Sequence, residues 1–148
     1  MALRDTLDLL VSTATAVGVL LACRQLALTR SQAVSAFEDA LAREYREIVQ
    51  SLPIEALLSE ELADAWLEDH LKDFYRYIDL TNEQIFLRAA GRITLATWNN
   101  WADGIRANMA RPAFRSAWQA IASGSPSSFA SLRRLEESGF KADPRSWR

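Results

Sequence analysis

The chain has 148 residues and a mass of 16.6 kDa, and its 17 basic and 19 acidic side chains give a formal charge of −2. This length suits one domain, and a composition that is 49% hydrophobic and 24% charged excludes wholesale disorder. One Cys and one His exclude an intramolecular disulfide and a zinc site built from several Cys or His ligands, and only four Pro and five Gly argue against a turn-rich β fold.

An uncharged apolar segment, Leu9–Cys23, lies between Asp8 and Arg24 near the start of the chain. As a helix its fifteen residues extend roughly 22 Å, against a hydrocarbon core of about 30 Å, so a span must place the flanking residues at the lipid interfaces. We interpret it as a single-pass anchor that contacts membrane lipid through residues 9–23. The chain then divides into an anchor, residues 1–25, and a helical soluble domain, residues 26–148.

The charges that flank this segment predict its orientation. Arg24 and Arg30 follow it and Asp5 and Asp8 precede it, so the positive-inside bias places the C-terminal domain in the cytoplasm. Two alternatives stay open: a core or oligomer-forming helix of a soluble cytoplasmic protein, and a secretory or lipoprotein signal. The second alternative depends on the LLAC sequence that ends at Cys23, a possible lipidation site, although the acidic leader is atypical of a signal.

A long first helix is predicted from about Arg4 to Leu52, because no helix breaker occurs before Pro53. Its apolar residues beyond the anchor recur at helical spacing, which predicts that the helix leaves the membrane and becomes a wall of the domain. These residues are Leu26, Val34, Phe37, Leu41, Tyr45, Ile48 and Leu52.

Two further helices are predicted in the middle of the chain. Ser59, followed by two acidic residues, predicts the start of a helix that runs to about Ile78. Thr81 and Gln84 match a capping box, which predicts that a third helix begins there and covers residues 82–109.

The third helix contains Gly91 and Gly104, which we expect to permit close approach of a neighbouring helix. Pro112 predicts the start of a short fourth helix, and a fifth is predicted over residues 126–138, ending at Gly139. The predicted fold class is therefore all-α: a long N-terminal helix plus a bundle of about four further helices.

Charge is segregated along the chain. Residues 31–83 carry 13 acidic and 4 basic side chains, whereas residues 111–148 carry 7 basic and 3 acidic ones. We interpret this either as a basic tail packed on an acidic middle or as two solvated faces. The basic surplus is too small to favour a nucleic-acid partner, because affinity for nucleic acid comes mainly from neutralised phosphates.

Catalytic motifs are absent from the sequence. His70 has Asp73 one helical turn away, but no nucleophile can be assigned to this pair, and an exposed or capping histidine is the simpler interpretation. A di-iron site needs two Glu-x-x-His pairs, and no phosphate-binding glycine loop or His-Glu-x-x-His motif occurs. We predict no catalytic residue, no metal and no cofactor, and a protein that is not an enzyme.

Arg88 and Arg92 are four residues apart on the predicted third helix, which is otherwise largely apolar. Half-buried guanidinium groups need acceptors, so we predict a charge network that fixes the packing of the first three helices. The alternative is a ligand-binding or enzymatic pocket for an anionic group, formed by the two arginines with Tyr75 and Glu83. The predicted acceptors of the network are Asp73, Asp79, Glu44 and Glu47.

Trp98 and Trp101 flank two asparagines, and large aromatic residues dominate both cores and protein interfaces. We interpret these tryptophans as core or interface anchors, which favours a protein partner or a homo-oligomer.

Several short motifs resemble those of small bacterial proteins with one N-terminal membrane helix and a helical cytoplasmic domain. The resemblance implies a location in the bacterial inner membrane, but it implies no activity and no catalytic residues. The function predicted is a membrane-anchored helical module for protein interaction or self-assembly. The motifs are Arg-Gln-Leu-x-x-Thr-Arg at residues 24–30, Phe37-Glu38, Tyr45-Arg46, Asn82-Glu83 and Trp98-x-x-Trp101.

Overall fold

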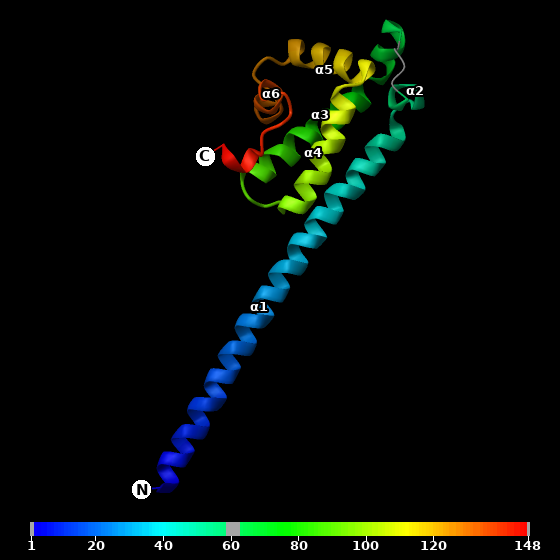
Figure 1. Cartoon of the computed structure of the whole chain (residues 1–148). Coiled ribbons are helices and arrows are strands. Elements are labelled where there is room, and N and C mark those ends of the chain that lie inside the picture. The colour runs from blue at the N-terminus through cyan, green and yellow to red at the C-terminus, as the bar shows by residue number, and fades with distance from the viewer. Residues whose placement is uncertain (1, 59–62, 148) are drawn as a thin grey trace. The chain divides into compact units, whose positions relative to one another are not determined.

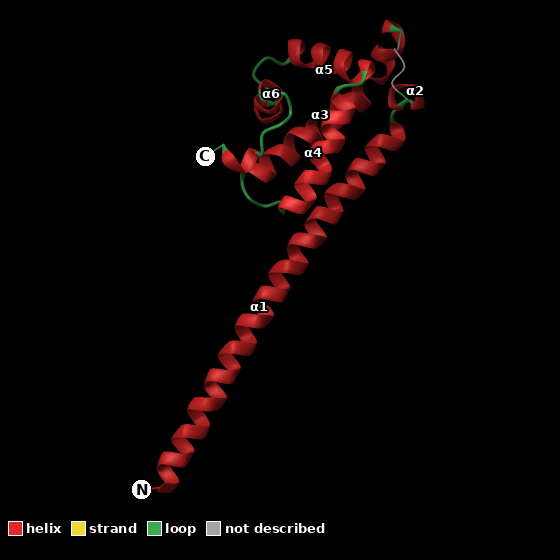
Figure 2. Cartoon of the chain, in the orientation of Figure 1, coloured by secondary structure: helices red, strands yellow, loops and turns green. Residues whose placement is uncertain are grey.

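The computed structural model is all-α, as predicted, and Figures 1 and 2 show helices joined by loops. It describes the backbone of residues 2–58 and 63–147 and the side chains of residues 13–58, 63 and 65–147. The chain divides into two compact units, residues 1–37 and residues 38–148. The predicted boundary after residue 25 therefore lies inside the first unit.

The long N-terminal helix is confirmed: α1 covers Ala2–Ser51 and ends just before Pro53, whose missing N–H cannot continue a helix. In the first unit every described side chain from residue 13 to residue 33 is exposed. Among the described side chains of this helix, the first buried one along the chain is Leu41, in the second unit.

The core of the second unit forms where the end of α1, α3 (Asp64–Ala89) and α5 (Pro112–Gly124) contribute large apolar side chains. Phe114 packs edge-on against Phe74 and Tyr77, with ring centroids 5.2 Å and 4.9 Å away. Ile48 of α1 is equally buried beside them in the core cluster. A four-residue helix, α2 (Ile54–Leu57), leads from α1 toward α3 and contacts α5.

The predicted helix start at Thr81 is wrong, because α3 continues through it to Ala89. Thr81 and Gln84 are 1% and 3% exposed and lie inside the helix, whereas a capping box caps the free N–H groups at a helix start. The break comes later: Gly91 adopts a left-handed φ of +75°, and the Thr94 hydroxyl caps α4 (Leu95–Met109). The predicted start of the preceding helix at Ser59 lies outside the described residues.

Gly91 and Gly104 were expected to permit close approach of a neighbouring helix, and neither does so. Their surroundings also differ from each other. A Cβ on Gly91 would lie 1.8 Å from the Arg145 Nη1 atom, so this glycine admits a side chain from the tail rather than a helix. A Cβ on Gly104 would meet no atom within 4 Å, so α4 has open space at that point.

The C-terminal helices agree with the prediction except at the start of the last one, which begins at Ala130 rather than at Pro126. Pro112 is the first residue of α5, and α6 (Ala130–Glu137) ends two residues before Gly139, which has a φ of +66°. The tail ends in a short 3-10 helix, η1 (Pro144–Ser146), and α5, α6 and η1 all contact α3. Phe140 and Trp147 are partly buried against the core, so the tail packs on the domain.

The acidic middle and the basic tail are not joined by any ion pair among the described residues. Arg133 instead donates to backbone oxygens of Ala122, Ser125 and Ser128, and its guanidinium lies 5.3 Å from the centre of the Trp118 ring. Arginines of the tail therefore satisfy carbonyl groups at the ends of neighbouring helices.

Candidate functional site

Arg88 forms an ion pair with the tail rather than with the predicted acceptors. Its Nε and Nη2 atoms donate to the two carboxylate oxygens of Asp143 at 2.8 Å and 2.6 Å, and Nη1 donates to the Ile93 carbonyl at 2.9 Å. The hydrogen bonds from Arg88 hold the pKa of the Asp143 carboxyl below its usual range, and the pKa of Arg88 is raised in turn. Each nitrogen of this guanidinium donates a hydrogen bond, and the two to Asp143 fix the tail to α3.

The other residues of the predicted anionic pocket do not meet Arg88 in the part of the chain that the structure describes. Arg92 lies in the loop after α3 and is exposed, because the helix ends at Ala89. Glu83 is exposed on α3, and the Tyr75 ring packs edge-on against Phe129 with centroids 5.5 Å apart. No hydrogen bond, ion pair or ring contact among the described residues joins these four side chains to one another.

The two predicted tryptophan anchors have different environments. Trp98 is buried in the core, whereas Trp101 is partly buried and lines a cavity.

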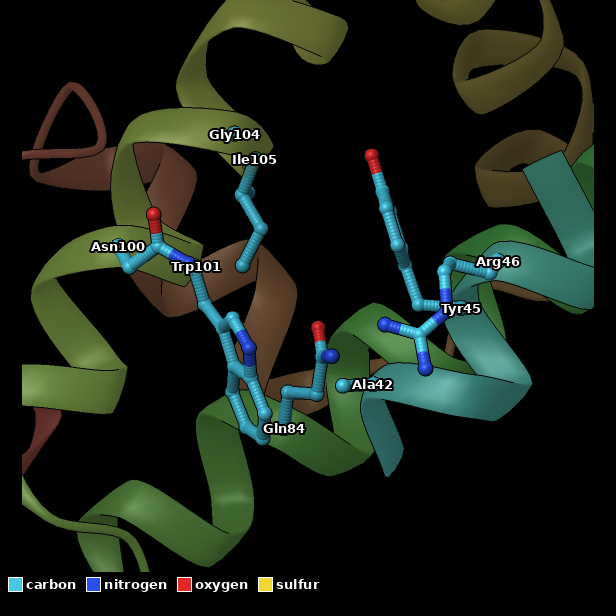
Figure 3. Close-up of a pocket in the computed structure, with 8 residues that line it drawn as sticks. All are labelled: Ala42, Tyr45, Arg46, Gln84, Asn100, Trp101, Gly104 and Ile105. Atoms are coloured by element: carbon cyan, nitrogen blue, oxygen red, sulfur yellow. The ribbon is translucent and has the colours of Figure 1, made fainter. Parts of the chain in front are cut away.

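That cavity, of about 350 Å³, lies between α1, α3 and α4 within the second unit, and we call it the Trp101 cavity. Figure 3 shows its walls: the Tyr45 ring from α1 faces Trp101 and Ile105 from α4, with the Gln84 carboxamide between them. Arg46 and Asn100 add a guanidinium and a second carboxamide. Its lining residues are Ala42, Tyr45, Arg46, Gln84, Asn100, Trp101, Gly104 and Ile105.

A buried amide holds the Tyr45 wall of the cavity in place. The Asn108 Nδ2 atom donates to the hydroxyl oxygens of Tyr45 at 3.3 Å and Tyr77 at 3.0 Å, and Arg111 donates to its Oδ1 atom. Burial raises the pKa of the Tyr77 hydroxyl to about 12, so it remains protonated at neutral pH.

Several of these residues stand out in the sequence, but no sequence pattern predicts that they line one cavity. Tyr45, Arg46 and Trp101 belong to the resemblance motifs, and Gln84 belongs to the capping-box pattern. One local signal points to the cavity: Trp101 and Gly104 are three residues apart, which places an aromatic ring beside a missing side chain on one helix face.

The remaining chemistry-bearing side chains that the structure describes form no second site. His70 Nδ1 lies 3.8 Å from a carboxylate oxygen of Asp73, and its ring packs against Trp66 at 4.6 Å. Among the described residues, no group of three or more His, Cys, Asp or Glu side chains could hold a metal ion. Cys23 is a free, exposed thiol on α1.

The described part of the first unit presents an apolar surface. Val17, Val19, Leu20 and Leu21 are at least half exposed, and Leu20 reaches 70%. A search of the described residues found no helix with the length and apolarity that crossing a membrane requires. Residues 9–12 of the predicted span lie outside the described side chains.

Fold and site together define an all-α protein in which an exposed apolar helix is joined to a helical domain with a polar, aromatic-walled cavity. Comparisons with protein-family models, with curated proteins and with solved structures found no match.

Proposed function

We propose that this protein is a membrane-anchored helical module for protein interaction, without catalytic activity, whose residues 9–23 contact lipid. The observation that carries the proposal is the exposure of the apolar side chains of α1 in the first unit. Side chains such as Leu20 stabilise a protein only when they leave water, at about 25 cal/mol per Å² of apolar surface. A segment of this kind therefore needs a cover, and lipid is one.

The distribution of these side chains around the helix favours lipid over a protein seam. Consecutive residues turn by about 100°, so Val17, Leu20 and Leu21 share one side of the helix, and Val19 lies about 160° around it from Val17, on the opposite side. A coiled-coil seam would concentrate the apolar residues on one narrow stripe. Lipid covers a helix from every side.

Flanking charges support the orientation with the domain in the cytoplasm. Arg24 and Arg30 are exposed on α1 after the apolar segment, where the positive-inside bias places the cytoplasmic face. The resemblance to bacterial proteins with one membrane helix supports the inner membrane as the location.

Two observations support an interaction role over catalysis. The only histidine, His70, contacts Asp73 and Trp66, and among the described residues it makes no hydrogen bond to a Ser, Thr, Cys or Lys side chain that it could activate. The second unit exposes further large apolar side chains, including Ile54, Phe86 and Leu95, which would suit a protein partner.

The test is fractionation of bacteria that express the full-length chain, with and without alkaline carbonate. We expect the protein in the membrane pellet and released only by detergent. Leu20→Arg places a charge inside the proposed span, where a charge costs about 2.5–3.5 kcal/mol at the bilayer centre and less toward the interface, and this should shift the protein toward the supernatant.

Leu28→Arg is the matched control, because Leu28 is also exposed on α1 but follows the basic residue that ends the apolar segment. We expect this variant to stay in the pellet. A native chain that is soluble without detergent contradicts the anchor. If both variants stay soluble and lose a native oligomer, the apolar helix is a protein interface instead.

A further inference from the structure

The Trp101 cavity has the walls of a site for a flat ring. Tyr45 and Trp101 place aromatic surfaces on two of its sides, and the Asn108 amide fixes the Tyr45 ring through its hydroxyl. At about 350 Å³ the cavity lies near the lower end of the range for small-molecule sites, about 300–1,000 Å³. Such a volume suits one ring system with one substituent.

Gln84 is the buried polar residue of this cavity whose side chain has no protein partner in the described part of the chain. Its residue is 97% buried, being 3% exposed, yet its carboxamide makes no hydrogen bond to any residue that the structure describes. No side-chain polar atom fully shut off from solvent lacks a partner in the described part of the chain, so the carboxamide reaches solvent through the cavity. Figure 3 shows it pointing into the space between Tyr45 and Trp101.

The space that this carboxamide faces is kept open by Gly104. Glycine in a helix interior costs about 1 kcal/mol relative to alanine, and here a Cβ would meet no atom within 4 Å. Neither close packing nor a left-handed φ requires glycine at this position. What a side chain at Gly104 would remove is cavity volume.

The polar groups of the cavity select the chemistry of an occupant. A carboxamide offers a donor and an acceptor side by side, which matches the paired acceptor and donor on the edge of a nucleobase. Arg46 makes no ion pair or hydrogen bond among the described residues, and the cavity has no acidic lining residue. A guanidinium in that setting favours an anion such as phosphate.

We propose that the Trp101 cavity binds a nucleoside monophosphate. The base lies between Tyr45 and Trp101, Gln84 pairs with its edge, and Arg46 receives the phosphate. This site is separate from the proposed anchor and does not depend on it.

The test is calorimetric titration of the full-length chain, in detergent and at low salt, with the four ribonucleoside monophosphates. Uncharged nucleosides and ribose 5-phosphate separate the contributions of base and phosphate. We expect at least one monophosphate to bind, more tightly than its nucleoside, and ribose 5-phosphate not to bind measurably. The proposal is overturned if no monophosphate binds with a Kd below about 1 mM, or if ribose 5-phosphate binds as well as the nucleotides.

Two pairs of variants locate the binding. Gly104→Leu fills the cavity and should abolish binding, whereas Gly124→Leu, where a Cβ also meets no atom, should leave it unchanged. Arg46→Ala should weaken binding about tenfold or more through the lost charge-assisted hydrogen bond. Arg43→Ala, the same charge change on an exposed α1 residue outside the cavity, should not.

Gln84→Met separates a binding role from a structural one. Because the carboxamide has no partner among the described residues, its loss should leave the melting temperature equal or higher while binding weakens. A lower melting temperature with unchanged affinity, or unchanged affinity in Gly104→Leu, would overturn the proposal.

Discussion

Replacing Asp143 with alanine removes both carboxylate acceptors of the Arg88 guanidinium and leaves only its bond to the Ile93 carbonyl. Breaking a buried ion pair on one side costs about 3–5 kcal/mol, because the remaining charge stays buried without compensation. The Arg88 side chain is 9% exposed but that of Asp143 is 37% exposed, so water screens the pair and the cost falls to about 2–3 kcal/mol. For a domain of this size that corresponds to a loss of roughly 6–12 °C in Tm.

The pH dependence provides a second measurement of the same contact. The pKa of Asp143 is lowered in the folded state, chiefly by the hydrogen bonds from Arg88, so its contribution is complete above the unfolded-state pKa near 4. The contribution is lost as the pH falls through the lower, folded-state pKa. Urea unfolding at pH 7 should therefore separate the native chain from Asp143→Ala fully, and the difference should shrink below pH 4.

The control is a double-mutant cycle with Arg88→Met. Adding this change to Asp143→Ala should recover part of the lost stability, because no buried charge then remains unpaired. Asp143→Asn should cost less than alanine, because the amide oxygen keeps an acceptor for the Arg145 N–H. A cost for Asp143→Ala below about 0.5 kcal/mol at pH 7, or one equally large at pH 3, would refute the reasoning.

Three further changes test the packing of the second unit by urea or thermal unfolding. The pKa of Tyr77 is raised to about 12 in the folded state, so its contribution to the free energy of unfolding is complete below pH 10 and is lost as the pH rises toward 12. Tyr77→Phe should remove this loss of stability at alkaline pH, which amounts to up to about 3 kcal/mol. Gly91→Ala should cost more than Gly139→Ala, since both have a left-handed φ, worth about 1–2 kcal/mol, but only at Gly91 would the Cβ meet the Arg145 side chain. Phe114→Ala should cost about 3–5 kcal/mol, and a smaller loss than either glycine change would contradict its place at the centre of the core.

The helices could be predicted where their ends carry local chemistry. Pro53 and Pro112 mark the end of α1 and the start of α5, because a missing N–H and a fixed φ act within one turn of the chain. Thr81 and Gln84 misled the prediction because a capping box uses residue types that also occur inside a buried helix. Only packing against the rest of the domain distinguishes the two cases, and it places both residues in the interior.

The candidate site could be predicted in part. The sequence shows that a buried arginine needs an acceptor, but it does not show which distant residue supplies one. Arg88 was expected to need an acceptor, and it has one, but the acceptor is 55 residues away on a tail that folds back over Gly91. The cavity has only the local Trp101 and Gly104 spacing as a sequence signal, because a void is defined by where three helices fail to touch. Its residues come from three helices, and periodicity says nothing of their juxtaposition.

The two proposals predict different effects for the same two variants, so the variants can test each proposal separately. The apolar segment lies in the first unit and the Trp101 cavity in the second, although α1 contributes residues to both. If both proposals hold, Leu20→Arg alters fractionation and leaves nucleotide affinity unchanged, while Gly104→Leu does the reverse. A variant that changed both properties would mean that the domain folds or binds only when its first helix is covered, and anchor and cavity would then be one functional unit.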